Sequence, residues 1–186
     1  AAQKEVDASI DRLIYFAGWA DKYQQVFSAV NPVASSHFNF SVLEPTGVVS
    51  IIAPDDSGLL GLVSNVAPTI VGGNTCVVLA SESMPLSAVS FAEVLHASDV
   101  PGGVVNILTG LRSELTGHFA SHMDVNAIVF CDGARKTART VQELASDNIK
   151  RVIARAGIDW GSESAQHPYL IRDTQEVKTT WHPIGS

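Results

Sequence analysis

The chain has 186 residues, of which 46% are hydrophobic and 17% charged, and its formal net charge is −7. This composition excludes a disordered chain and suffices for one domain or two small ones. The sequence contains neither an apolar run of the roughly 18–20 residues that a membrane span requires nor a basic run. We therefore expect no membrane and no nucleic acid as a partner. Both cysteines lie in apolar segments and are interpreted as buried free thiols, which favours a cytoplasmic location.

The N-terminal part of the chain predicts one helix and one strand. Residues 2–24 carry apolar side chains at helical spacing. Asn31-Pro32 predicts a turn. Residues 33–43 alternate between apolar and polar side chains, with Phe38 and Phe40 on the apolar positions, which is typical of a half-exposed strand.

From residue 44 onward, short apolar runs alternate with segments of helical periodicity. This alternation predicts an α/β fold, an open parallel Rossmann-like sheet with helices on both faces. Ser83 and Pro85 are expected at the cap and first turn of one helix. A last strand is predicted at 175–181, with no crossover helix before it. The runs that predict the parallel strands are residues 48–53, 75–79, 104–108, 127–131 and 151–154.

A motif search finds no glycine-rich phosphate loop, no nucleophile elbow and no metalloprotease motif. A series of short phrases nevertheless resembles the aldehyde dehydrogenase superfamily, in the same order and with similar spacing over almost the whole chain. The phrases are Glu44-Pro45-Thr46-Gly47, Ile52-Ala53-Pro54, Ala67-Pro68, Gly73-Asn74-Thr75, Ser81-Glu82, Pro101-Gly102-Gly103-Val104-Val105-Asn106, Thr109-Gly110 and Asp124-Val125.

The resemblance implies a division of the chain. Residues 1–30 would form an N-terminal helix, and residues 44–168 a degenerate α/β domain that is similar to the family's cofactor-binding domain. Residues 31–43 and 169–186 would form a small discontinuous β flap, because 176–181 resembles the family's C-terminal oligomerisation strand.

Three departures from the family pattern remove its catalytic groups. The Asn that stabilises an oxyanion in the family is replaced by Asp56, whose carboxylate would repel an oxyanion. The general-base Glu is replaced by Arg155, which is no base at neutral pH. The domain that carries the nucleophilic Cys is missing between Arg155 and Glu176. We therefore expect no catalytic residue in this chain.

The cofactor pattern is also incomplete. The family's ribose-binding Lys falls on Leu79, although Ser81 and Glu82 remain. Its phosphate-binding segment contains Asp132 and Gly133, so a negative charge lies where a pyrophosphate would bind. We interpret Ser81, Glu82 and Gly133 as vestigial cofactor-binding residues. We therefore expect no cofactor, and the sequence leaves weak NAD(P) binding as the alternative.

These features resemble the C-terminal non-catalytic module of the tandem aldehyde dehydrogenases of family sixteen. The expected function is dimerisation or structural support of a catalytic aldehyde dehydrogenase module, through an exposed sheet edge. One alternative is a segment of an active NAD(P)-dependent enzyme whose nucleophile lies elsewhere, and another is a small-ligand sensor. The expected interface residues are Phe38, Phe40, Val177 and Trp181.

Several side chains have two interpretations. His118 and His122 have a metal-compatible spacing but no third ligand, so we expect no metal site. Glu82 is either a former ribose contact or a residue at the start of the next helix. Asp132 is expected to raise the pKa of Cys131, which favours a structural thiol. Asp55 and Asp56 are expected on a solvated turn, pointing apart. Arg135, Lys136 and Arg139 form either a solvated helix face or a phosphate site.

Overall fold

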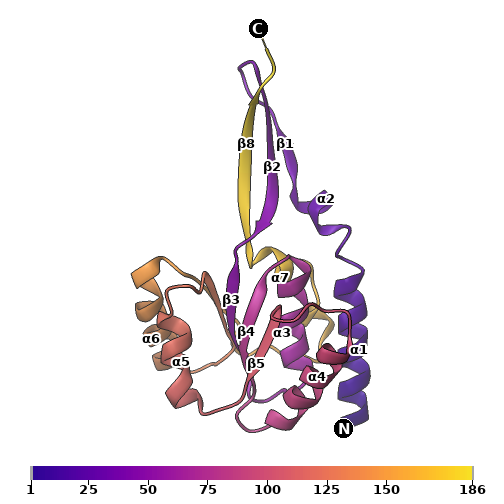
Figure 1. Ribbon diagram of the computed structural model, residues 1–186, viewed down its shortest axis with the longest axis vertical. Coiled ribbons are helices and arrows are strands. Elements are labelled where there is room, and N and C mark those ends of the chain that lie inside the picture. Colours follow the sequence, from indigo (N-terminus) through magenta and orange to yellow (C-terminus); the bar gives the residue numbers. More distant parts are fainter. Residues whose placement is uncertain (1, 186) are drawn as a thin grey trace.

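Five parallel strands in the order β5-β4-β3-β6-β7 form the central sheet of the computed structural model, which describes residues 2–185 (Figure 1). Each strand is a short run of mostly apolar residues, as expected for strands covered on both faces. The predicted α/β fold is therefore confirmed. The strands are β3 (Val48–Ile52), β4 (Thr75–Leu79), β5 (Val105–Leu108), β6 (Ala127–Phe130) and β7 (Arg151–Ala154).

Helices cover both faces of this sheet. On one face α3 (Leu60–Val71) and α4 (Pro85–Ala97) pack against the sheet, and α1 (Ala2–Ala17) lies outside α3. On the other face lie α5 (Arg112–Ser121) and α6 (Arg135–Ala145). None of the helices within residues 2–185 combines the length and hydropathy that crossing a bilayer would need.

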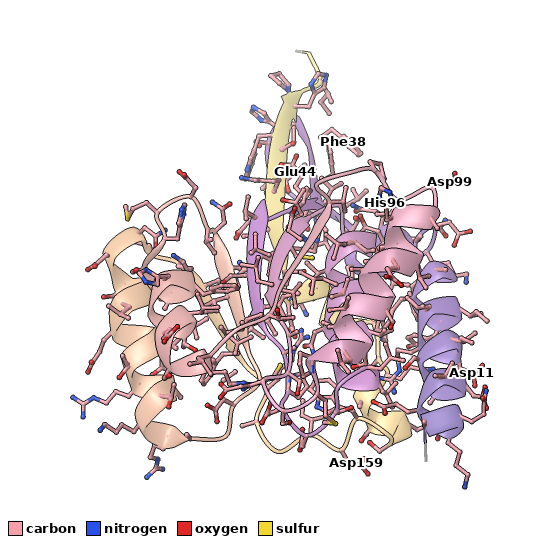
Figure 2. The ribbon with its side chains drawn as sticks, turned by 60° about the horizontal axis from the view of Figure 1, so that its bottom comes forward. Asp11, Phe38, Glu44, His96, Asp99 and Asp159 are labelled. Atoms are coloured by element: carbon pink, nitrogen blue, oxygen red, sulfur yellow. The ribbon has the colours of Figure 1, made fainter. Side chains whose placement is uncertain are left out.

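The core follows from the alternation of side chains along each strand. Val49 and Ile51 of β3 point toward α3, whereas Ile52 points toward α5 and α6. All three are fully buried. Burial of each such side chain contributes about 1.5–3 kcal/mol relative to leaving it exposed. A third cluster forms around the buried ring of Phe16 in α1. Figure 2 shows the other side of α1, with Asp11 pointing to solvent.

A three-stranded antiparallel sheet, the flap, projects from the α/β body (Figures 1 and 2). It consists of β1 (Ala29–Asn31), β2 (His37–Pro45) and β8 (Gln175–Pro183). β2 lies in the centre and pairs with β8 along its whole length, from His37–Pro183 to Pro45–Gln175. The pairing of the two predicted strands is confirmed. The expectation that Phe38 and Phe40 lie on an edge strand is wrong, because β1 covers the other side of β2.

Some element boundaries differ from the prediction. The first helix ends at Ala17 rather than near residue 24. After Gly18 the backbone hydrogen bonds change from a spacing of four residues to a spacing of three, as from Trp19 N–H to the Phe16 carbonyl. A short helix, α2 (Tyr23–Phe27), follows. β8 begins at Gln175, and the residues after Pro168 form the short helix α7 (Tyr169–Arg172) instead. Short 3₁₀ turns lie at Ser146–Asn148 and Glu163–Ala165.

Candidate functional site

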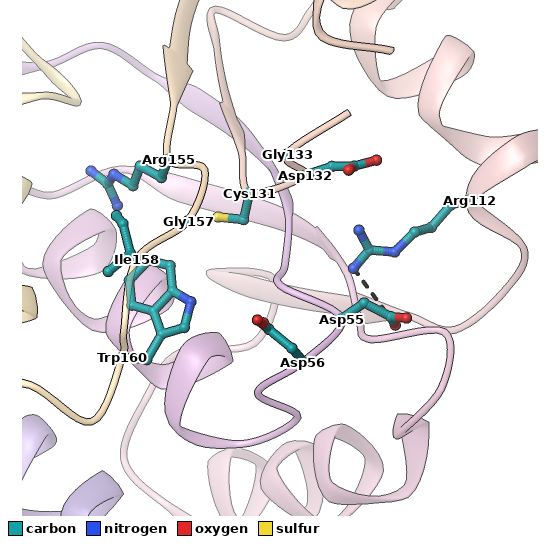
Figure 3. A pocket seen from close by; sticks show the side chains of 10 residues that line it. All are labelled: Asp55, Asp56, Arg112, Cys131, Asp132, Gly133, Arg155, Gly157, Ile158 and Trp160. Carbon is teal, nitrogen blue, oxygen red and sulfur yellow. Dashed lines mark ion pairs between the residues drawn. The ribbon is translucent and has the colours of Figure 1, made fainter. Parts of the chain in front are cut away.

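A cavity of about 340 Å³ lies at the carboxyl ends of β3, β6 and β7. The strand order reverses between β3 and β6, and such a switch point is where open α/β sheets bind ligands. Figure 3 shows the side chains around it. The cavity brings together the expected Asp56, Gly133 and Arg155, but not Ser81 or Glu82. Its lining residues are Asp55, Asp56, Arg112, Cys131, Asp132, Gly133, Arg155, Gly157, Ile158 and Trp160.

The carboxylate of Asp55, which was expected on a solvated turn, accepts hydrogen bonds from other residues of the chain. Its Oδ1 accepts from the backbone N–H of Ser83 at 3.0 Å and from Ser81 Oγ at 2.9 Å. Arg112 Nη2 lies 3.9 Å from the same oxygen. The Ser83 N–H, more than the other partners, holds the pKa of the Asp55 carboxyl below its ordinary value. Figure 3 shows Asp55 directed toward Arg112 and Asp56 directed elsewhere.

The lowered pKa of Asp55 predicts an acid-dependent loss of stability. A depressed carboxyl pKa stabilises the fold above the unfolded value of about 4 and ceases to do so as the pH falls through the folded pKa. We expect the melting temperature of Asp55→Asn to fall less between pH 6 and pH 3 than that of the wild type. Thermal unfolding followed by circular dichroism at both pH values measures the difference. The exposed Asp99→Asn is the control, and an Asp55→Asn curve that matches it would contradict the assignment.

Ser83 was expected to cap α4, but it does not. The hydroxyl of Ser83 donates to the backbone oxygen of Asp55, and the Oγ of Ser81 accepts from the Met84 N–H at 3.0 Å. The chain before α4 is therefore tied to the end of β3. Because Ser81 also donates to Asp55, its hydroxyl both donates and accepts within the chain.

Glu82 precedes α4, but its side chain caps the N-terminus of α5. Its Oε2 accepts from the backbone N–H of Arg112, the first residue of α5, at 2.7 Å. Neither interpretation made from the sequence anticipated this contact, which joins residues 30 positions apart. The Arg112 side chain turns back and donates to the Ala53 carbonyl. Arg112 was missed by the sequence analysis, although an arginine in the first turn after β5 was a usable signal.

Cys131 lies at the wall of the cavity but is buried. Burial raises the pKa of its thiol to about 12, and that of Cys76 likewise to about 12. The expectation that Asp132 would raise the Cys131 pKa is wrong, because burial is the main cause and Asp56 the carboxylate that adds to it. The Sγ of Cys131 lies 3.6 Å from Asn65 Oδ1.

We expect both thiols to be unreactive in the folded chain. With a pKa of about 12, about one Cys131 in ten thousand is a thiolate at pH 8. Iodoacetamide at pH 8 should leave the native protein unmodified for hours and label both cysteines in guanidinium chloride, as read by intact mass. Labelling of Cys131 within minutes under native conditions would show an activated thiol.

Arg155 links three elements of the fold. Its Nη1 donates to Asn65 Oδ1 of α3 at 2.8 Å, and its Nη2 pairs with Asp173 Oδ2 at 2.9 Å. The side chain is only 4% exposed. In Figure 3 its guanidinium is directed away from Asp56 and Arg112. The residue at the expected general-base position therefore serves as a buried structural cation.

The remaining charged candidates lie outside this cavity. His118 and His122 border a separate apolar cavity of about 370 Å³ beside α5. No cluster of three His, Cys, Asp or Glu side chains in residues 2–185 is arranged to hold a metal ion. Arg135 and Lys136 are exposed, and Arg139 pairs with Glu143 four residues on.

One face of the flap, the apolar face, carries an apolar groove, whereas the opposite face mixes polar side chains with Val177 and Trp181. Directly paired residues share a face, so Val30, Phe38 and Phe40 lie together, with the two rings 5.5 Å apart. They line an open apolar groove of about 340 Å³. Val177 and Trp181 pair with Leu43 and Asn39 and lie on the opposite face. The four expected interface residues thus divide between two faces.

The fold and the position of the cavity define an open α/β domain with a switch-point site. The model of the aldehyde dehydrogenase family matches residues 1–159, and the chain belongs to this family. It is 39% identical over 145 residues to hydroxyisobutyraldehyde dehydrogenase of Mycolicibacterium austroafricanum, covering 78% of this chain and 28% of that protein. It is 34% identical over 154 residues to cytosolic aldehyde dehydrogenase 1 of Elephantulus edwardii, covering 82% and 30%.

Solved structures agree with this assignment. The crystal structure of PnpE in complex with nicotinamide adenine dinucleotide matches with a TM-score of 0.76 and 31% identity, covering 82% of this chain and 31% of PnpE. The chain spans about a third or less of the length of these relatives.

Proposed function

We propose that the chain is a non-catalytic aldehyde-dehydrogenase-like module that acts through its flap. It would form a homodimer or support a catalytic module, which is the role implied by its resemblance to the second module of the family-sixteen tandem enzymes. The observation that carries the proposal is Arg155, whose side chain is committed to Asn65 and Asp173 where the family pattern expects a base. The cytosolic relative favours a cytoplasmic location.

The thiols support the absence of turnover. Aldehyde oxidation by this family's pattern needs a cysteine nucleophile, and a thiol works as a nucleophile only as its thiolate. Cys76 and Cys131 are both buried, and burial raises both pKa values to about 12. Purified chain should therefore give no NAD(P)-dependent oxidation of propanal or benzaldehyde. Formation of NADH or NADPH above the enzyme-free rate would refute this part of the proposal.

The flap supports the binding part of the proposal. Val30 and Phe38 are 67% and 46% exposed, so the apolar face is open to a partner. The long outer strand β8 also leaves one edge of the flap without a neighbour in the described part of the chain. Two copies that join their apolar faces would bury the rings of Phe38 and Phe40 on both sides.

Dimerisation through this face has a direct test. We expect light scattering to give the mass of a dimer for the wild type, and Phe38→Ser/Phe40→Ser to weaken association at least tenfold, because truncation of central aromatic side chains costs about 1 kcal/mol or more each. Val177→Ser/Trp181→Ser changes the opposite face and is the matched control. A dissociation constant of about 100 µM corresponds to an association free energy of ~5 kcal/mol. A wild-type chain that is still monomeric at about 100 µM would refute self-association and leave only a heterologous partner.

A segment of an active enzyme is the second candidate. The observation that favours it is coverage, since the chain matches only 28–31% of the relatives' length. The intact mass of the protein in its natural source separates the two functions. A longer polypeptide that contains a cysteine nucleophile and oxidises aldehydes would favour this candidate.

A further inference from the structure

Four helices start at the edge of the sheet that holds the cavity. Helices α3, α4, α5 and α6 each follow a parallel strand, so their N-termini lie at the carboxyl edge. The first N–H groups of a helix have no partner within it, and they attract anions together with the helix dipole. This is how open α/β sheets usually bind the phosphates of a nucleotide.

In this chain the N-termini of α3 and α5 are already occupied by distant carboxylates. Glu5 of α1 reaches across to α3, where its Oε1 accepts from Leu59 N–H at 3.0 Å and Leu60 N–H at 3.2 Å. Glu82, which follows β4, accepts from the Arg112 N–H of α5 at 2.7 Å. Both contacts use the N–H groups that a bound phosphate would need.

The other two carboxylates lie closer in sequence to the helices that they precede or neighbour. Asp55 accepts from the N–H of Ser83, two residues before the first residue of α4, at 3.0 Å. Asp132 accepts from the Ala134 N–H at the start of α6 at 2.9 Å. The guanidinium of Arg112, which lines the cavity, lies 3.9 Å from Asp55, so its charge is balanced within the chain.

We propose that Glu5, Asp55 and Asp132 are specificity-determining residues that make this edge of the sheet reject NAD(P) and other phosphate ligands. Glu82, which falls on the family's ribose contact, is withheld from a ribose by its bond to the Arg112 N–H. Glu5 and Asp132 accept from N–H groups at helix starts, and Asp55 balances the charge of Arg112 at the cavity wall. A dinucleotide pyrophosphate would have to displace these carboxylates and would meet Asp55 and Asp132 at the cavity wall. The residues present therefore do not fit the family's cofactor. This inference deepens the proposed loss of cofactor use and rests on that part of the proposed function.

Calorimetric titration of NAD, ADP and inorganic pyrophosphate into the purified chain is the first test. We expect no saturable binding of any of the three by the wild type at millimolar concentration. The double variant Asp55→Asn/Asp132→Asn removes two negative charges from the cavity wall and leaves Arg112 without its balancing carboxylate. It should bind ADP and pyrophosphate at least tenfold more tightly than the wild type, with affinity that falls as salt is added.

The control double variant Glu93→Ser/Asp147→Ser removes the same charge from exposed positions that make no contact with these helix starts. An equal gain of affinity in this control would overturn the inference, because net charge alone would then explain it. If Asp55→Asn/Asp132→Asn does not fold, the single variant Asp132→Asn keeps the contacts of Asp55 and should show a smaller gain.

Two outcomes overturn the inference without touching dimerisation. One is saturable NAD or ADP binding by the wild type, and the other is a folded double variant with no gain. Light scattering on the same samples reports the flap interface separately, so failure of the two proposals can be told apart.

Discussion

Replacing Arg155 by glutamate is expected to destabilise the chain by about 3–5 kcal/mol, the cost of leaving a buried charge without its partner. The new carboxylate would face Asn65 Oδ1, which now accepts from the arginine, and Asp173, which now pairs with it. The substitution restores the residue type of the family's general base but not its surroundings. We therefore expect loss of stability and no gain of aldehyde oxidation. Urea unfolding measures the first and NADH formation the second.

The control for this prediction is a substitution of an exposed arginine on helix α6. Arg139 is 81% exposed and pairs with Glu143, so Arg139→Glu should change stability by about 0.5 kcal/mol or less. Arg155→Lys keeps the positive charge but loses the planar fork, and should fall between the two. An Arg155→Glu variant as stable as Arg139→Glu would show that the buried contacts of Arg155 contribute little.

Replacing Arg12 by leucine should cost about 3 kcal/mol, because four hydrogen bonds from one guanidinium are lost and three of the four acceptor residues are buried. The guanidinium donates to Ser64 Oγ at 2.6 Å and to the carbonyl oxygens of Ala165 and Trp160 at 2.9 and 3.0 Å. It also donates to Gln166 Oε1 at 2.9 Å. Burial lowers the pKa of Arg12.

The loss should be visible at the cavity as well as in stability. Arg12 holds residues 159–166, and Trp160 of this loop forms part of the cavity wall. We expect the tryptophan emission of Arg12→Leu to shift to longer wavelength below the unfolding transition. Arg139→Leu, which removes only an exposed pair, should leave both stability and emission unchanged. Unchanged emission in Arg12→Leu would mean that the loop is held by its own packing.

The parallel strands could be predicted to within one or two residues. Runs such as Thr75–Leu79 and Ala127–Phe130 are short, apolar and rich in β-branched residues because both of their faces are buried. The place of β2 within the flap could not be predicted. Its neighbour β1 has only three residues, too few to display a period-two pattern.

The contacts of the site were harder to infer than its residues. The sequence pattern singled out Asp56, Gly133 and Arg155, and all three line the cavity. The partners are set by tertiary packing. Glu5 meets Leu59 and Arg12 meets Gln166, and no local periodicity relates positions 54 or 154 residues apart.

The pairing of β2 with β8 also determines when the flap can form. The paired residues are about 130 or more positions apart, so this contact has a high closure cost and is slow. During synthesis at about 5–20 residues per second, β2 emerges on the order of ten seconds before its partner. In that interval β1 and β2 can form only a hairpin, in which the edge of β2 lacks its partner strand and is open to other nascent chains. Binding by a chaperone at this edge, or early pairing with a second copy, would protect the edge until β8 arrives.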